Sequence, residues 1–223
     1  MKYKRLVCIG GHHLDAELMG GPLLIKYAMQ GAHCTMINVT EGRLDRKGAT
    51  EQEKQEYLDN IRQENVACDE AMQCECYNMK YTSATLPSQE EFIEMLMDYF
   101  KKEKVDLVVT HWRGTMHPRH YYTYETVTAA VQRLRREGIN IQLLYGENCE
   151  DLIGFTPTCY VTITDEQVQM WFDALKKYII FNGTVNDVPY QNYYQAQLKV
   201  RAIEGGIPSP VKAYMHAPLS NNE

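Results

Sequence analysis

The stretch "GGHHLDAELMGG", residues Gly10 to Gly21, directly follows the first hydrophobic run of the chain. The run "RLVCIGG", residues 5–11, ends in glycines and predicts a buried strand. The apolar spacing of residues 15–31 predicts a helix, with Gly31 as its stop. An α/β protein usually keeps its first ligand-binding turn between two such elements. Here that turn holds two histidines, an aspartate and a glutamate, with Leu14 among them.

Strand-like and helix-like segments then alternate along the rest of the chain. Expected strands cover residues 33–40, 74–81, 105–111, 140–146 and 159–164, and expected helices cover 51–72, 88–104, 121–138, 166–178 and 190–206. We expect Thr50 and Ser88 to cap the helices that they precede. Such alternation predicts an α/β fold with a mostly parallel sheet covered by helices on both faces. The 223 residues contain no repeat or linker, so we expect one domain spanning residues 1–223.

Composition narrows the classes of partner and location. The net charge of −6 argues against a nucleic-acid partner held by counterion release. The sequence has no apolar run long enough for a membrane span, and its N-terminal apolar stretch is too short for a secretory signal, so we expect a cytoplasmic protein away from membranes. The seven cysteines form no CxxC pair, and we interpret them as reduced thiols without a role in function.

Five of the seven histidines lie in two turns that follow predicted strands. The turns are "GGHHLDAE", after the first strand, and "THWRGTMHPRH", after "DLVV". In an open α/β sheet, the carboxyl ends of strands meet in a crevice where the strand order reverses, so we expect the turns to converge. Two imidazoles and one carboxylate, with one position left for water, are the ligands of a catalytic zinc site. The turns therefore predict metal-assisted hydrolysis, whereas the glycines lack the GxGxxG spacing of a dinucleotide site.

These residues resemble the motifs of the PIG-L or LmbE-like deacetylases. Residues 11–28, "GHHLDAELMGGPLLIKYA", align without a gap with the family's A-H-P-D-D-A-E-L-G-x-G-G motif and the helix after it. Residues 111–120 correspond to its H-P-D-H motif with an upstream histidine, and the similarity continues through 146–164 and 193–206. The resemblance implies a Rossmann-like three-layer sandwich with a mostly parallel sheet. It also implies zinc-dependent removal of acetyl groups from N-acetylglucosamine conjugates and related amides.

The family's metal ligands have counterparts in this chain. The resemblance assigns zinc binding to His12, Asp15 and His120, and places His117 at the oxyanion or the leaving group. A shifted alignment that starts from His13 would make Asp15 the general base. It would also put an alanine at the second ligand position, so we prefer the ungapped alignment.

Three departures from the family pattern surround these ligands. The aspartate that acts as the family's general base is Leu14 here, and leucine cannot accept a proton. The aspartate within H-P-D-H is Arg119, and a second aspartate often found two residues before that motif is Thr115.

Another group has to replace the lost base if the protein is an enzyme. General acid–base catalysis contributes about 10²- to 10⁴-fold to a rate, so hydrolysis by the metal alone would be slower. His13 is our first candidate because an imidazole has a suitable unperturbed pKa. Glu41 and Asp45, after the second strand, are further candidates or solvated loop charges.

Arginines near the two turns are candidates for substrate binding. Arg119 would bind a carboxylate or phosphate beside the metal, or form a structural ion pair with Glu17 or Glu41. Arg43 and Arg113 lie in loops at the same expected edge of the sheet.

Two functions therefore remain open. The first is a zinc-dependent amide hydrolase acting on an N-acetylated amino sugar or similar small amide. The second is a catalytically inactive protein that keeps the fold, with or without the metal, and binds a sugar-like ligand or a partner. Relatives often form homo-oligomers, but the sequence fixes no oligomeric state.

Overall fold

The computed structural model describes residues 2–44, 47–183 and 187–218, and these form one seven-stranded sheet. The strand order is β3-β2-β1-β4-β5-β7-β6. The strands are β1 (Arg5–His12), β2 (His33–Thr40), β3 (Glu75–Tyr81), β4 (Leu107–Thr110), β5 (Gln142–Gly146), β6 (Cys159–Thr162) and β7 (Val211–His216). Strands β1 to β5 pair in parallel, and β7 runs antiparallel to both β5 and β6.

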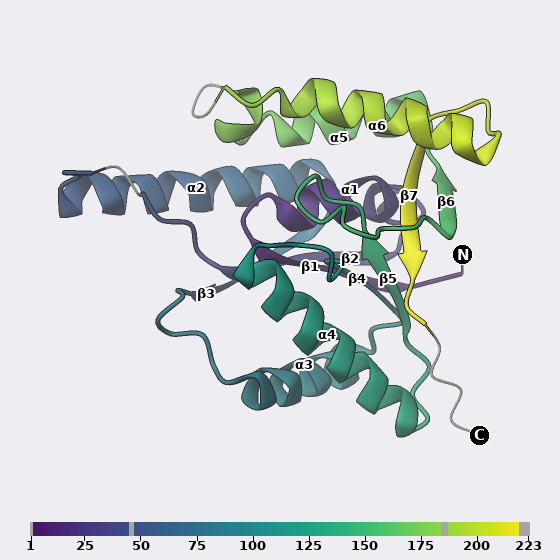
Figure 1. The fold of residues 1–223 in the computed structure, drawn as a ribbon, viewed down its shortest axis with the longest axis horizontal. Helices are drawn as coiled ribbons and strands as arrows, with labels where there is room; N and C mark the ends of the chain where they lie inside the picture. The colour runs from purple at the N-terminus through teal and green to yellow at the C-terminus, as the bar shows by residue number, and fades with distance from the viewer. Residues whose placement is uncertain (1, 45–46, 184–186, 219–223) are drawn as a thin grey trace.

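Helices cover both faces of the sheet, which makes three layers (Figure 1). Helices α1, α2, α5 and α6 lie on one face, and α3 and α4 lie on the other. Their bounds are α1 (Asp15–Ala28), α2 (Glu51–Ala71), α3 (Gln89–Glu103), α4 (Pro118–Arg136), α5 (Asp165–Leu175) and α6 (Tyr190–Gly205), with a short 3₁₀ helix, η1, at Ile180–Asn182. The prediction of an α/β sandwich with a mostly parallel sheet is confirmed.

Each face of the sheet has its own hydrophobic core. Side chains alternate between the faces of β1, so Leu6 and Cys8 pack on the core under α1 and α5, whereas Val7 and Ile9 pack on the core under α3 and α4. In α3 the fully buried residues Phe92, Leu96 and Phe100 are four apart, which places them on one stripe facing the sheet.

Local signals set most helix boundaries. Thr50 and Ser88 cap their helices as expected, and each also forms a capping box, Thr50 with Glu53 and Ser88 with Glu91. Helix α1 ends at Ala28, earlier than expected. The chain turns at the residues that follow, and Gly31 (φ 89°) adopts the left-handed conformation there.

The C-terminal strand β7 is absent from the expectations drawn from the sequence. Its residues, "VKAYMH", include Lys212, which interrupts the apolar pattern. In the structure Lys212 is fully buried because its ammonium donates to the backbone oxygen of Glu147 (3.0 Å) and to the Gln197 side-chain oxygen (2.6 Å).

Two further observations concern membrane-spanning helices and the cysteines. No helix in the described part of the chain is long and apolar enough to cross a membrane. All seven cysteines are free thiols.

The strand order reverses between β1 and β4. From β1 the chain proceeds outward through β2 and β3 on one side, and through β4 and β5 on the other. The carboxyl ends of β1 and β4 therefore border the crevice in which such sheets bind ligands. The two histidine-rich turns leave the sheet at these two ends.

Candidate metal centre and active site

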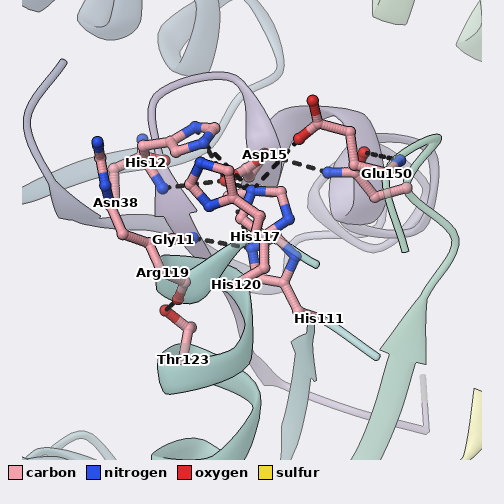
Figure 2. A network of polar contacts seen from close by, with 12 residues as sticks. Gly11, His12, Asp15, Asn38, His111, His117, Arg119, His120, Thr123 and Glu150 are labelled. Atoms are coloured by element: carbon pink, nitrogen blue, oxygen red, sulfur yellow. Dashed lines mark hydrogen bonds and ion pairs between the residues drawn. The ribbon is translucent and has the colours of Figure 1, made fainter. Parts of the chain in front are cut away.

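The three predicted metal ligands meet at the carboxyl ends of β1 and β4 (Figure 2). His12 is the last residue of β1, Asp15 is the first residue of α1, and His120 lies in the first turn of α4. Asp15 and His120 are buried, and His12 is partly exposed. Residues more than a hundred positions apart in the sequence thus form one cluster.

Two glycines permit this close approach. A Cβ atom on Gly10 would lie 2.6 Å from the backbone nitrogen of Ala16 and 2.7 Å from the Cβ of Asp15. A Cβ atom on Gly11 would lie 3.1 Å from the His120 ring. Only glycine lets the end of β1 pack directly against the first turns of α1 and α4.

The spacing of the donor atoms suits a small tetrahedral cation. Asp15 Oδ2 lies 3.1 Å from His12 Nδ1 and 3.2 Å from His120 Nε2. The Nε2 atoms of His12 and His120 are 3.2 Å apart. Ligands bound tetrahedrally to zinc at about 2.0–2.1 Å stand roughly 3.3 Å from one another. The ligand types therefore fit zinc, and the separation of Asp15 Oδ2 and His120 Nε2 matches it. His12 approaches Asp15 with Nδ1 and His120 with Nε2, and only one of these two nitrogens can bind an ion.

Hydrogen bonds orient the Asp15 carboxylate. Asn148 Nδ2 donates to its Oδ1 (3.0 Å), and the backbone N–H of His12 donates to its Oδ2 (3.0 Å). Burial by itself would raise the pKa of Asp15, but the imidazoles of His12, His120 and His111 hold it well below its usual range. Asp15 is therefore a carboxylate, the form that binds a metal.

Asp151 orients two histidines at once. Its Oδ1 lies 2.9 Å from Nδ1 of His120, and its Oδ2 lies 2.6 Å from Nδ1 of His111. The backbone N–H of Gly11 donates to Nε2 of His111 (2.8 Å), and the same nitrogen lies 3.4 Å from Asp15 Oδ2, so His111 borders the centre. Asp151 leaves Nε2 of His120 facing His12 and Asp15, an arrangement common around zinc-binding histidines.

The centre stabilises positive charge even without a metal ion. Burial opposes protonation of His120, but Asp15 and Asp151 raise its pKa to about 10. Burial also works against the Asp151 charge, yet hydrogen bonds from His111 and His120 lower its pKa to about 2. A cation bound between these carboxylates would occupy an environment already organised for one.

A pocket of about 220 Å³ opens beside the cluster, smaller than the roughly 300–1,000 Å³ of typical ligand pockets. Its size suits a small molecule. Its lining includes His12, His13, Leu14, Asp15, Leu18, Gly42, Arg43, Tyr57, Ile61, His117, Arg119, Asn148, Cys149, Glu150, Tyr178, Ile180 and Tyr190.

His117 and His13 both face this pocket. His117 is the N-cap residue of α4, and its ring centroid lies 5.0 Å from that of His12. Burial and the neighbouring histidines lower the pKa of His117 to about 4. Burial also lowers the pKa of His13 to about 4. Within the described residues, Nδ1 of His117 and both ring nitrogens of His13 are buried without a hydrogen-bond partner.

Leu14 occupies the position of the family's catalytic aspartate in a strained backbone conformation. It is the N-cap residue of α1, with φ of 78°, in the left-handed region. Its side chain packs in the core beneath α1 and also lines the pocket, with only 7% of the residue exposed. It forms no side-chain cap, because leucine has no polar atom to accept a hydrogen bond.

The ion pairs considered for Arg119 do not form. Arg62 pairs with Glu41 through both Nε (2.8 Å) and Nη2 (2.6 Å). Glu41, one of the candidate bases, is therefore already engaged by Arg62. Buried Glu17 accepts hydrogen bonds instead from the side chains of Asn38, Asn65 and Tyr178. Within the described residues, the Arg119 guanidinium has one hydrogen-bond partner, the hydroxyl of Thr40, with Oγ1 at 3.5 Å from Nη1.

The remaining sequence candidates lie at the edge of the pocket or outside it. Arg43 is exposed and lines the pocket. Arg113 does not line it, and its guanidinium stacks on Trp112, 5.1 Å from the ring centre. Asp45 lies outside the described residues.

Glu150 is a pocket residue that the sequence interpretation missed. It follows β5, and its Oε2 lies 3.6 Å from His120 Nε2 (Figure 2). The loop "NCED", residues 148–151, thus supplies Asn148, Glu150 and Asp151 to one centre. The only signal in the sequence was the family similarity through residues 146–164, which named none of these residues individually.

Comparisons with solved structures establish the fold. The chain superposes on A40926 pseudoaglycone deacetylase with a TM-score of 0.72, 18% identity and 96% of each chain covered. For N,N'-diacetylchitobiose deacetylase from Pyrococcus horikoshii the TM-score is 0.73 at 16% identity, covering 97% of this chain and 85% of the other. For 4-carboxy-2-hydroxymuconate hydratase from Pseudomonas putida the TM-score is 0.75 at 13% identity, covering 99% and 98%. Because one of these proteins is a hydratase, the shared fold does not by itself establish a reaction.

The amino-acid sequence supplies the family. A search of curated proteins finds no match. The family model of PIG-L, GlcNAc-PI de-N-acetylase, matches residues 7–131, more than half of the chain and both histidine-rich turns. The chain therefore belongs to the PIG-L de-N-acetylase family.

Proposed function

We propose that this protein is a metal-dependent amide hydrolase that removes the acetyl group from an N-acetylated amino sugar or a similar small amide. The observation that carries the proposal is the cluster of Asp15 Oδ2 with the His12 and His120 nitrogens, at 3.1–3.2 Å. Two of its members are held in place by further hydrogen bonds, His120 by Asp151 and Asp15 by Asn148.

His12, Asp15 and His120 would hold the ion, and their ligand types favour zinc. A zinc ion bound there supplies Lewis acidity, which lowers the pKa of water and polarises the scissile carbonyl.

His117 is assigned to the oxyanion and the leaving amine. It lines the pocket beside His12, and no described residue competes for its Nδ1. A ring nitrogen in this position can donate a hydrogen bond to the carbonyl oxygen as negative charge develops there. Because its lowered pKa leaves His117 neutral near pH 7, the proton that the amine needs as the C–N bond breaks is the one released by the attacking water, which His117 can pass on to the amine nitrogen.

Glu150 is assigned as the proton acceptor that replaces the family's aspartate. Its Oε2 lies 3.6 Å from the ligand nitrogen of His120, and Asp15 and Glu150 are the only carboxylates among the described residues that line the pocket. Since Asp15 is committed to the cluster, Glu150 is the group able to take a proton from the attacking water. Burial lowers the pKa of His13 to about 4, which makes its ring a weak proton acceptor, so we assign His13 to the substrate instead.

The second candidate function is a binding protein without turnover. Leu14 favours it, because a buried leucine stands where the family places its base. Such a protein would bind metal and ligand but release no acetate.

Metal content and acetate release together test the proposal. Protein purified without added metal or chelator is expected to carry about one zinc ion per chain, and His120→Ala is expected to lose it. His33→Ala is the matched control, because His33 pairs with Glu75 at the opposite end of β2. Acetate release from a panel of N-acetylated sugars and amides, abolished in His120→Ala, would support the hydrolase. Bound zinc with no acetate release would favour the binding protein, and absence of metal even after zinc is supplied would contradict the metal centre.

A further inference from the structure

Arg119 places an unneutralised positive charge in the pocket. It is half-buried in the first turn of α4, where the family motif has an aspartate. Within the described residues its guanidinium forms no ion pair, and its only hydrogen bond is the long one to Thr40 Oγ1. Arginine's planar fork of donors matches carboxylate and phosphate groups. A guanidinium held in a pocket without an acidic partner therefore has its binding capacity available to a ligand.

The nearby carboxylates are engaged elsewhere. Asp15 and Glu150 both lie beside His120, and Glu41 pairs with Arg62. Relative to the family motif, Leu14 removes one negative charge, and Arg119 replaces another with a positive charge. The pocket is thus more positive than the motif would make it, and a bound metal ion would increase the difference.

His13 is a second, independent sign of a ligand. Only 7% of this residue is exposed, and it lines the same pocket. Neither ring nitrogen forms a hydrogen bond of ordinary geometry with a described residue, although the Asn65 side chain lies close enough to interact with the ring. Buried polar groups are nearly always hydrogen-bonded, because leaving one unpaired is costly. A neutral imidazole offers one N–H donor and one acceptor, so a polar ligand in the pocket would satisfy it.

The arrangement of these groups suggests how a ligand would lie. Figure 2 shows Arg119 running past His12 on the side of the cluster away from Glu150. In this view, His12 and His120 lie between Arg119 and Glu150. A ligand anchored at Arg119 would extend across the cluster towards Glu150.

We propose that the substrate carries an anionic oxyacid group, a carboxylate or a phosphoryl group, that pairs with Arg119 and accepts a hydrogen bond from His13. The scissile amide would then lie over His12, Asp15 and His120. The placement of the amide rests on the proposed hydrolase function, whereas the anion site stands on the contacts of Arg119 and His13.

Small probes test the anion site directly on the protein as purified. Succinate is compared with its neutral isostere succinamide, and inorganic phosphate is the second anion. Binding to the wild type and to every variant is measured by isothermal titration calorimetry. In the wild type it is also followed by NMR through the guanidinium Nε–H signal of Arg119, which is assigned by its loss in Arg119→Gln. Succinate is expected to bind about 10- to 100-fold more tightly than succinamide, the range of one charge-assisted hydrogen-bonded pair.

Variants attribute that preference to Arg119. Arg119→Gln is expected to remove the advantage of succinate over succinamide, and Arg119→Lys to keep part of it because lysine lacks the bidentate fork. Arg113→Gln is the matched control and is expected to keep the full advantage, since Arg113 lies outside the pocket. Zinc content and the thermal unfolding midpoint are recorded for each variant, so that loss of metal or of folding is distinguished from loss of the anion site.

Each outcome decides the proposal. Equal binding of succinate and succinamide to the wild type would overturn it, as would an advantage that survives in Arg119→Gln. If phosphate binds more tightly than succinate and needs Arg119, the anion site is supported and its group is phosphoryl. Acetate release is measured separately: release without anion preference would leave the hydrolase standing and reject the anion site. If succinate is preferred and the preference needs Arg119, but no acetate is released, the anion site stands and the hydrolase is rejected.

Discussion

Asp151 Oδ1 lies 2.9 Å from Nδ1 of His120, on the side of the ring that faces away from the candidate metal centre. This contact fixes which nitrogen of His120 faces His12 and Asp15. Through its other oxygen, Asp151 also holds His111, whose ring stacks on that of His120 with 4.0 Å between centroids. One buried carboxylate thus connects the loop after β5 to the first turn of α4.

Replacing Asp151 with asparagine is expected to weaken metal binding without unfolding the protein. Loss of such a supporting carboxylate typically costs about 10- to 100-fold in metal affinity. Competition with a chromophoric chelator measures the affinity, and circular dichroism checks the fold. Asp98→Asn, at an exposed position on α3, is the matched control. Unchanged affinity in Asp151→Asn would show that His120 is oriented without this carboxylate.

Removing the Glu150 carboxylate tests its role as the proton acceptor. Glu150→Gln is expected to lower kcat for acetate release by about 10²- to 10⁴-fold, with zinc content unchanged. Adding Leu14→Asp to Glu150→Gln is expected to restore part of the activity, because it returns a carboxylate to the family's position. If Glu150→Gln retains full kcat, the proton acceptor is another group, and His13→Gln becomes the next variant to assay.

The left-handed backbone at Leu14 is expected to reverse the usual ranking of alanine and glycine. Both Leu14→Ala and Leu14→Gly lose the buried leucine side chain, but only glycine adopts φ of 78° without strain. The glycine variant should therefore be more stable than the alanine variant by about 0.5–1 kcal/mol in the free energy of unfolding.

The control for this comparison is Val66, an exposed residue within α2. There Val66→Ala is expected to be more stable than Val66→Gly by about 1 kcal/mol. Urea denaturation of the four variants measures both differences. The same ranking at both positions would mean that backbone strain at Leu14 is negligible.

Buried thiols make the stability sensitive to alkaline pH. Burial raises the pKa of Cys8 and Cys68, and for Cys74 a hydrogen bond with Cys34 and burial do the same. In the unfolded chain the thiols lose their protons at about pH 8.5, whereas in the folded protein they keep them. Their contribution is fully present below that pH and is lost as the pH rises, by about 1.4 kcal/mol per pH unit for each thiol.

Urea denaturation between pH 7 and pH 10 measures this loss. Cys68→Ala is expected to be less stable at pH 7 but to lose stability less steeply with pH. A slope identical to that of the wild type would show that Cys68 ionises equally in both states. Cys159→Ala, at a partly exposed position on β6, is the comparison for a less buried thiol.

The sequence by itself determined most of the helices and strands and the metal-ligand candidates. Apolar runs and their spacing predicted β1, β2 and the helices that follow them, and Thr50 and Ser88 cap their helices as expected. These signals are local, because a capping residue and the turn that it starts lie within four positions of each other. The turns that carry His12, Asp15 and His120 were found because each directly follows a strand.

Only the tertiary structure decided which side chains surround those ligands. Asn148 and Asp15 are 133 positions apart, and nothing local to either residue indicates that they hydrogen-bond. Arg113 and Arg119 look alike in the sequence, yet one stacks on Trp112 and the other lines the pocket. Strand β7 likewise depends on distant partners, because buried Lys212 is satisfied by Glu147 and Gln197. Strand order and long-range packing fix such contacts, and neither leaves a periodic signal in the chain.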